Sequence, residues 1–212
     1  MTQRNPDIKS DILATATRIF ADCGCEGTTI RQIAQHANVS LPSIYHYFSD
    51  KHSLYIQVCS RAIEEMSRRQ QKILHSGLPP QQVLLQFTAS LCQQLHENVV
   101  FAKLLQRLLV DKENSDLDEI SRTLFQQSFR DLIDLVSTVV TTSDAPFLAF
   151  SVYALAFGLI QLNTVHDAVQ PEPLIPGTPA DLAIRILELL MPNVGWKQYV
   201  TDEDLPLIGA TA

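Results

Sequence analysis

Glycine is scarce in this sequence, at 7 of 212 residues, and no window shows sustained alternation of apolar and polar side chains. Antiparallel sheets joined by tight hairpins need glycine at turn positions where φ is positive. The shortage therefore predicts an all-α fold. Because 46% of the residues are hydrophobic, the composition excludes a disordered chain and predicts a globular protein.

The motifs of common enzyme and metal sites are also lacking. The four cysteines form no Cys-x-x-Cys pair and no pair of histidines accompanies them, so we expect no zinc site, no other metal and no cofactor. The chain has no glycine-rich phosphate loop and no Ser-His-acid motif, and it is therefore predicted not to be an enzyme. Cys23-Gly24-Cys25 leaves two alternatives open: a redox-active pair, or small residues at a helix end in a reducing compartment.

Two segments bear on where the chain works. Residues 1–11 are polar and lack the apolar core of a secretion signal, which predicts a cytoplasmic protein. Residues 145–165 contain no Asp, Glu, Lys or Arg and are long enough to span a bilayer. Polar residues inside this run, and acidic residues rather than basic clusters at its ends, favour a helix buried on nearly all sides, in the core or in a subunit interface.

Apolar residues recur at helical spacing in successive segments, which caps, glycines and prolines divide into about nine helices. Thr29 and Gln32 form a capping-box pattern, Ser40 is the N-cap residue of the next helix, and Ser49-Asp50 caps the one after it. Asn38 suits the turn before Ser40 because asparagine tolerates positive φ. The expected helices cover residues 5–23, 30–37, 41–48, 51–77, 83–95, 101–109, 117–140, 146–166 and 179–191, and the tail from residue 193 is expected to be an extended surface segment.

The second and third of these helices are short and are joined by a tight turn, which is typical of a helix-turn-helix motif. Ile44 and Phe48 form the inner face of the third helix, so the Tyr-His-Tyr run at residues 45–47 is left outside. Exposed phenols and imidazole can reach phosphates or base edges in DNA. The alternative is an ordinary three-helix core that carries a few surface aromatics.

The stretch from Gly27 to Lys51, GTTIRQIAQHANVSLPSIYHYFSDK, resembles the DNA-binding signature of the TetR family of bacterial transcription regulators. The resemblance implies a three-helix DNA-binding domain over residues 1–50 and a helical ligand-binding and dimerisation domain over residues 51–212. It also implies a homodimer that binds a palindromic operator on the bacterial nucleoid. The sequence departs from the family pattern at Asn38, where glycine is usual, and at Pro42, where a small residue is common.

The resemblance implies roles for the positions that match the motif. Thr29 and Arg31 would contact phosphate, with Thr28 close by, and Lys51 would bind backbone phosphate. Leu41 offers only apolar contact. The implied DNA-binding residues are Thr28, Thr29, Arg31, Leu41, Pro42, Ser43, Tyr45, His46, Tyr47 and Lys51, of which those between Pro42 and Tyr47 would lie on the major-groove face.

The net charge of −7 argues at first against DNA as a partner, since DNA attracts positive charge. The charge is divided unevenly along the chain. Residues 1–75 carry nine Lys and Arg against seven Asp and Glu, or +2, and residues 76–212 carry seven against 16, or −9. The acidic excess therefore lies outside the expected DNA-binding domain.

Two half-sites of B-DNA require two copies of a three-helix reader, so dimerisation is a functional requirement of the motif. The uncharged helix and the last helix are the candidates for the dimer interface, although the uncharged helix could instead be central core. The interface residues we expect are Ala154, Gly158, Gln161, Leu182, Ile186 and Leu189.

The helices between these two regions are rich in aromatic residues, and in a protein of the resembled family some of them would line a ligand cavity. The expected lining is Phe87, Cys92, Phe101, Phe125, Phe129, Tyr153 and Phe157. Such a cavity favours a hydrophobic or aromatic effector that weakens operator binding by stabilising another conformer. A regulator controlled by a partner protein, with no small ligand, is the alternative.

Overall fold

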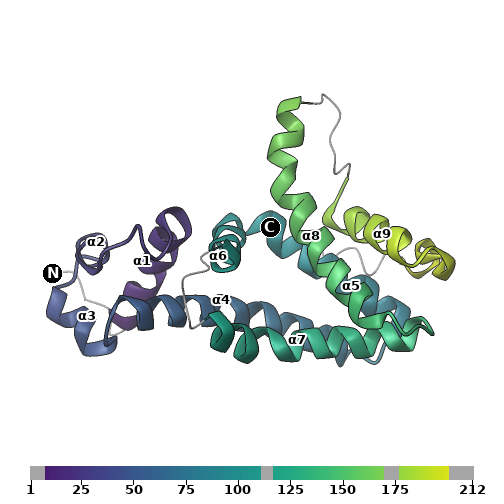
Figure 1. Cartoon of the computed structure of the whole chain (residues 1–212), viewed down its shortest axis with the longest axis horizontal. Helices are drawn as coiled ribbons and strands as arrows, with labels where there is room; N and C mark the ends of the chain where they lie inside the picture. Colours follow the sequence, from purple (N-terminus) through teal and green to yellow (C-terminus); the bar gives the residue numbers. More distant parts are fainter. Residues whose placement is uncertain (1–7, 111–116, 170–176, 201–212) are drawn as a thin grey trace, which may run out of the picture.

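The computed structural model describes residues 8–110, 117–169 and 177–200. Over these residues the fold is all-α, as predicted, and Figure 1 shows α1, α2 and α3 at one end of an elongated molecule. The elements are α1 (Ile8–Cys23), α2 (Ile30–His36), α3 (Leu41–Tyr47), α4 (Lys51–Leu74), α5 (Pro80–Glu97), α6 (Val99–Val110), α7 (Leu117–Val139), α8 (Ala145–Val169), α9 (Pro179–Leu190) and two short 3-10 helices, η1 (Pro192–Val194) and η2 (Trp196–Tyr199). The expected helix start at residues 5 and 6 and the proline loop at residues 171–176 lie outside the described residues.

Local capping chemistry fixes the short helices of the head, which comprises α1, α2 and α3. The Thr29 side chain accepts a hydrogen bond from Gln32 N, and Thr29 N donates to Gln32 Oε1 over 2.8 Å, which completes the predicted capping box. Ser40 caps α3 and Asp50 caps α4, also as predicted. Asn38 has φ of 53°, so the turn between α2 and α3 uses the left-handed conformation expected there.

The head has its own apolar core, to which the start of α4 contributes. The Phe20 and Tyr55 rings meet edge to face, with centroids 5.1 Å apart. Because Leu54 and Tyr55 are fully buried, α4 is anchored in the head before it runs toward the rest of the molecule. The largest buried side chains here are Ile12, Phe20, Ile33, Ile44, Phe48, Leu54 and Tyr55.

The body, formed by α5 and α7–α9 with the second half of α4, is built around α5. This helix contacts α4, α6, α7, α8 and α9. Leu84, Phe87 and Cys92 on α5 have no exposed surface. Helix α9 lies along α5 and buries one face of its own, which holds α5 at the centre of the body (Figure 1).

The prediction of an extended surface tail was wrong for residues 193–200, the part of the tail that the structure describes. Residues after α9 form η1 and η2, and Trp196 is fully buried while its indole Nε1 donates to Met191 O over 2.9 Å. A tryptophan carries a large apolar area and one N–H donor. Here the apolar area is buried against the body and the N–H is hydrogen-bonded.

Helix α8 is less buried within the chain than a helix of the core would be. The stretch Ala145–Asn163 has a mean hydropathy of 1.8 and the length of a membrane span, but only 22% of its window is buried within the chain. Figure 1 shows the C-terminal part of α8 projecting from the body. The exposed apolar residues on α8 are Phe147, Phe150, Leu162 and Val169. The core explanation of this helix is therefore wrong for most of its surface.

Candidate nucleic-acid interface

Helix α3 separates its residues into an inner and an outer face. Ile44 is fully buried and Phe48, which follows the helix, is 2% exposed. Tyr45 and Tyr47 are 55% and 37% exposed, and His46 is exposed beside Tyr47 with ring centroids 4.9 Å apart. The buried pair fixes the orientation of α3, and the two phenols and the imidazole face outward.

The beginning of α3 is held by hydroxyl groups. Ser40 Oγ lies 2.7 Å from Ser43 Oγ and accepts a hydrogen bond from Ser43 N. Pro42 is exposed at the first turn, where no backbone N–H is needed. Leu41 is half-buried and packs against the head core, so it has limited surface for contact with a base.

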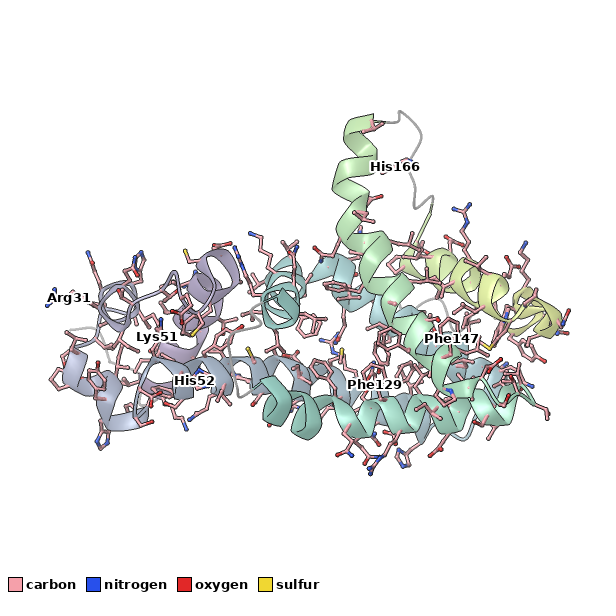
Figure 2. The ribbon with its side chains drawn as sticks, in the orientation of Figure 1. Arg31, Lys51, His52, Phe129, Phe147 and His166 are labelled. Atoms are coloured by element: carbon pink, nitrogen blue, oxygen red, sulfur yellow. The ribbon has the colours of Figure 1, made fainter. Side chains whose placement is uncertain are left out.

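Two cationic side chains flank α3 at the starts of its neighbours. Arg31 is exposed in the first turn of α2, and Lys51 is the first residue of α4. Figure 2 shows both at the head end of the molecule. Lys51 Nζ lies 3.6 Å from Glu26 Oε1, in an ion pair whose carboxylate is largely exposed.

Threonines 28 and 29 have different surroundings. Thr29 is exposed, and its hydroxyl donates to Gln32 Oε1 over 2.9 Å within the cap. Thr28 is 1% exposed and its hydroxyl donates to Gly24 O over 2.7 Å. Thr28, expected among the DNA-binding residues as a neighbour of the phosphate contacts, therefore has no side-chain group free for DNA, because its hydroxyl is buried and already satisfies the end of α1.

The outer face of α3 and its flanking cations have the chemistry to bind duplex DNA. A short helix fits the major groove, where hydroxyl and imidazole groups meet base edges and phenol rings meet thymine methyl groups. Cations at the starts of α2 and α4 suit phosphates on either side of the groove. Figure 2 places Phe129 and Phe147 in the body, away from this end.

Three of the expected ligand-lining residues meet in the body. Tyr153 of α8 meets Phe129 of α7 with ring centroids 4.7 Å apart and Phe87 of α5 with centroids 6.3 Å apart. Burial raises the pKa of Tyr153 to about 12. We call Phe87, Phe129 and Tyr153 the aromatic cluster.

Of the other expected lining residues, three are buried or half-buried on the helices that carry the cluster and one lines a cleft. Cys92 is fully buried on α5, and this burial raises the pKa of its thiol to about 12. Phe101 lines a cleft of about 390 Å³ between α1, α4, α5 and α6. Phe125 and Phe157 are half-buried against the body core.

The expected dimer residues divide between surface and core. Ala154 is exposed, Gly158 and Gln161 are half-buried, and Leu189 is 70% exposed. A Cβ on Gly158 would meet nothing within 4 Å. Leu182 and Ile186 are 4% and 1% exposed, so their placement in the interface was wrong. Their apolar stripe faces α5 of the same chain, which the sequence pattern could not distinguish from a partner.

Sequence reasoning missed polar residues that join elements far apart in the chain. Gln70 is 2% exposed on α4, and Ser128 Oγ of α7 donates to Gln70 Oε1 over 2.7 Å. Lys103 of α6 contacts Asp22 of α1 over 2.7 Å. A signal for Gln70 was present, because it interrupts the apolar stripe of Ile63 and Met66 at helical spacing.

Comparison with known proteins places the head in a family. Residues 12–58 match the sequence profile described as bacterial regulatory proteins of the tetR family. The transcriptional repressor AcnR of Corynebacterium diphtheriae is 34% identical over 70 residues, which are 33% of this chain and 35% of AcnR. The match thus spans about a third of the length of this curated relative.

Solved structures extend the likeness to the whole fold. FadR of Bacillus subtilis, solved with stearoyl-CoA, superposes with a TM-score of 0.71 at 16% identity, over 89% of this chain and 98% of FadR. AibR, solved with isovaleryl coenzyme A and operator DNA, superposes with a TM-score of 0.69 at 16% identity, over 87% of this chain and 98% of AibR. Residues 12–58 thus match the tetR family of bacterial regulatory proteins, and the chain as a whole shares the all-α fold of FadR and AibR.

Proposed function

We propose that this protein is a cytoplasmic, dimeric transcriptional repressor that binds a palindromic operator and is released by an acyl-CoA. The observation that carries the proposal is the outer face of α3, where exposed Tyr45, His46 and Tyr47 lie between the cationic starts of α2 and α4. This surface contains the donor groups and the cations that a major-groove reader needs.

A dimer supplies a second head, so that both half-sites of the operator can be bound. Half-sites one turn of B-DNA apart need recognition helices about 34–36 Å apart, and a longer operator needs a wider spacing. The exposed apolar face of α8 supports such a dimer, since monomeric proteins rarely leave a contiguous apolar surface of this kind in water. Two copies that pair through α8, with exposed Leu189 of α9 beside it, would cover this face.

The effector class is inferred from the body and from the two solved relatives. The aromatic cluster lies where α5, α7 and α8 meet, and it suits the apolar part of a ligand. FadR and AibR were each solved with an acyl-CoA. An acyl-CoA that binds more tightly to a conformer with misplaced α3 helices weakens operator binding by that difference in affinity.

The DNA-binding part of the proposal is tested by selecting bound sites from random DNA with the full chain. We expect a palindrome, and we expect Tyr45→Ala and Lys51→Ala each to weaken binding to that site by about tenfold in a gel shift. Arg68→Ala is the matched control, because this exposed cation lies about 25 Å farther along α4. Unchanged binding by both head variants would contradict the proposed reading surface.

The effector part is tested on the assembled protein–operator complex. Stearoyl-CoA and isovaleryl-CoA are added separately, with free CoA as the control for the nucleotide. We expect at least one acyl-CoA to release the operator and free CoA to leave it bound. Retention of the operator with every acyl-CoA would favour control by a partner protein.

A further inference from the structure

The cleft beside Phe101 lies at the boundary between the head and the rest of the molecule, and we call it the junction cleft. Its volume of about 390 Å³ is within the range of pockets that bind small ligands. Thr17 lines it from α1 of the head, and Gln94 and Phe101 line it from α5 and α6. An occupant therefore contacts both sides of this boundary, so its affinity depends on how the head is oriented.

The lining of the junction cleft is apolar where it is buried and polar where it is exposed. Val58 and Met66 of α4 and Phe101 and Leu104 of α6 form an apolar floor, and each is at most 5% exposed. A ligand group with an apolar face and a polar edge suits such a lining. The rim consists of exposed polar side chains, which include Arg61, Glu65, Arg69, Glu97 and Asn98.

The charged side chains of the rim differ in their partners. Arg69 lies 3.3 Å from Glu65 in an ion pair, and Glu97 accepts a hydrogen bond over 3.1 Å from the preceding turn of α5. Arg61 donates over 3.4 Å to the neutral hydroxyl of Ser10 and pairs with no carboxylate of the described residues. A guanidinium stays charged and binds phosphate through two parallel hydrogen bonds. Arg61 is therefore the rim cation best suited to a phosphate.

The junction cleft and the aromatic cluster lie along one face of α5. Gln94 lines the cleft and Phe87 belongs to the cluster. Phe87 precedes Gln94 by two helical turns, which places both on the same face of the helix about 10 Å apart. The extended pantetheine arm of CoA is longer than this separation. One acyl-CoA is therefore long enough to place its acyl chain at the cluster and its nucleotide in the cleft.

We propose that the junction cleft binds the nucleotide end of the acyl-CoA effector, with the adenine against the apolar floor and a phosphate on the Arg61 guanidinium. This inference rests on the proposed effector class and adds the place where the polar end of the effector binds. The phosphate competes with Ser10 of α1 for Arg61, and Thr17 of α1 lines the same cleft. Binding is thereby coupled to the position of α1 in the head.

The test compares two ligands that share an acyl chain. Stearoyl-CoA and isovaleryl-CoA are each titrated calorimetrically beside the corresponding S-acyl pantetheine, which keeps the thioester and lacks the nucleotide. In the unchanged protein we expect the acyl-CoA to bind about a hundredfold more tightly, because the pantetheine form loses both the base contact and the charge-assisted hydrogen bond. Arg61→Gln should lower this ratio to about tenfold, since it removes the phosphate contact alone.

A second variant tests the cleft from another helix. Gln94 is half-buried on α5, and Gln94→Trp would fill the space that the nucleotide occupies. We expect it to bring the two ligands within about twofold of each other, because neither the base nor the phosphate then fits. The ratio of two affinities on one protein cancels any general loss of stability.

Arg68→Gln is the matched control, since this exposed arginine of α4 lies outside the cleft and the ratio should stay near a hundredfold. A ratio near one in the unchanged protein, or a ratio that either Arg61→Gln or Gln94→Trp leaves unchanged, overturns the inference and leaves the proposed function standing. An equal fall in Arg61→Gln and Arg68→Gln would show an effect of total charge and would also overturn it. Absence of acyl-CoA binding by the unchanged protein overturns the proposed effector class and this inference together.

Discussion

The ion pair between Lys51 and Glu26 limits how strongly the DNA-facing side of the head attracts phosphate. The Lys51 ammonium lies 3.6 Å from the Glu26 carboxylate, which is 86% exposed. An exposed pair of this kind contributes little to stability. Beside DNA its effect is larger, because the carboxylate repels phosphate and competes for the cation that would meet it.

We expect Glu26→Gln to tighten operator binding about threefold at low salt, since it removes a negative charge beside the phosphates and releases Lys51. The gain should shrink as salt is added. Binding is measured by fluorescence anisotropy across a salt series. Glu188→Gln is the matched control, because it breaks a pair with Lys197 of the same 3.6 Å length at the other end of the molecule. Equal effects of the two variants would show that Glu26 acts only through net charge.

Single residues also show which features could be predicted from the sequence. The Thr29 cap, the Ser40 cap and the positive φ of Asn38 depend on neighbours within a few positions, so the sequence contains the needed information. The role of Thr28 depends on how α1 ends against the following loop, and its hydroxyl is buried there. Thr28 therefore has the residue type that the family motif has at this position, but its side chain is buried and cannot take the expected role.

At the scale of elements, α6 is joined to the end of α1 by two cationic side chains. Lys103 Nζ lies 2.7 Å from Asp22 Oδ1, and Arg107 donates to Asp22 O over 3.1 Å. Cations are favourable at the C-terminal end of a helix, where the last carbonyl groups have no partner in the helix. We therefore expect a shift of α6 to reach the head through α1 as well as through α4.

We expect Asp22→Asn to weaken the link between effector and operator while leaving each binding event intact. The factor by which stearoyl-CoA lowers operator affinity should fall about threefold, since coupling is a free energy shared by the two sites. Operator affinity without stearoyl-CoA should change by less than about twofold, because an exposed ion pair contributes little. Both quantities come from anisotropy titrations with and without stearoyl-CoA.

Arg69→Gln is the control for this variant, since it breaks an exposed 3.3 Å pair with Glu65 inside α4. Its coupling factor should equal that of the unchanged protein. A coupling factor that stays constant in Asp22→Asn would show that α4 alone carries the signal.

The positions of the helices were predicted better than the partner that each apolar helix face packs against. Hydrophobic spacing located α9 and its apolar stripe, but the stripe faces α5 and not a partner. Trp196 lies beyond the last predicted helix and is buried by η2 folding back on the body. Spacing indicates that a face is apolar, and only the packed structure shows what covers it.

The whole molecule divides its charge between its two ends. The segment with the reading head, residues 1–75, carries +2 and residues 76–212 carry −9. Negative charge on the body disfavours contact with DNA anywhere except at the head, which suits a protein that should bind in one orientation. A weakly positive head also predicts modest affinity for nonspecific DNA, so that specificity depends on the outer face of α3 and on pairing of two heads.

A dimer that forms through α8 would hold two heads together, and one charge on α8 should break it. Ala154 is exposed on α8, one turn before Gly158, where a Cβ would find open space within the chain. A carboxylate at this position has water around it in a single chain, but an apolar partner helix would bury it without a counter-charge, at a cost of several kcal/mol. We therefore expect Ala154→Glu to sediment as one chain and to lose at least about tenfold in operator affinity, since one head binds one half-site.

Gln126→Glu, at an exposed site on α7, is the control and should remain a dimer. A dimer mass in Ala154→Glu would place the subunit contact elsewhere and would leave the apolar face of α8 to another partner.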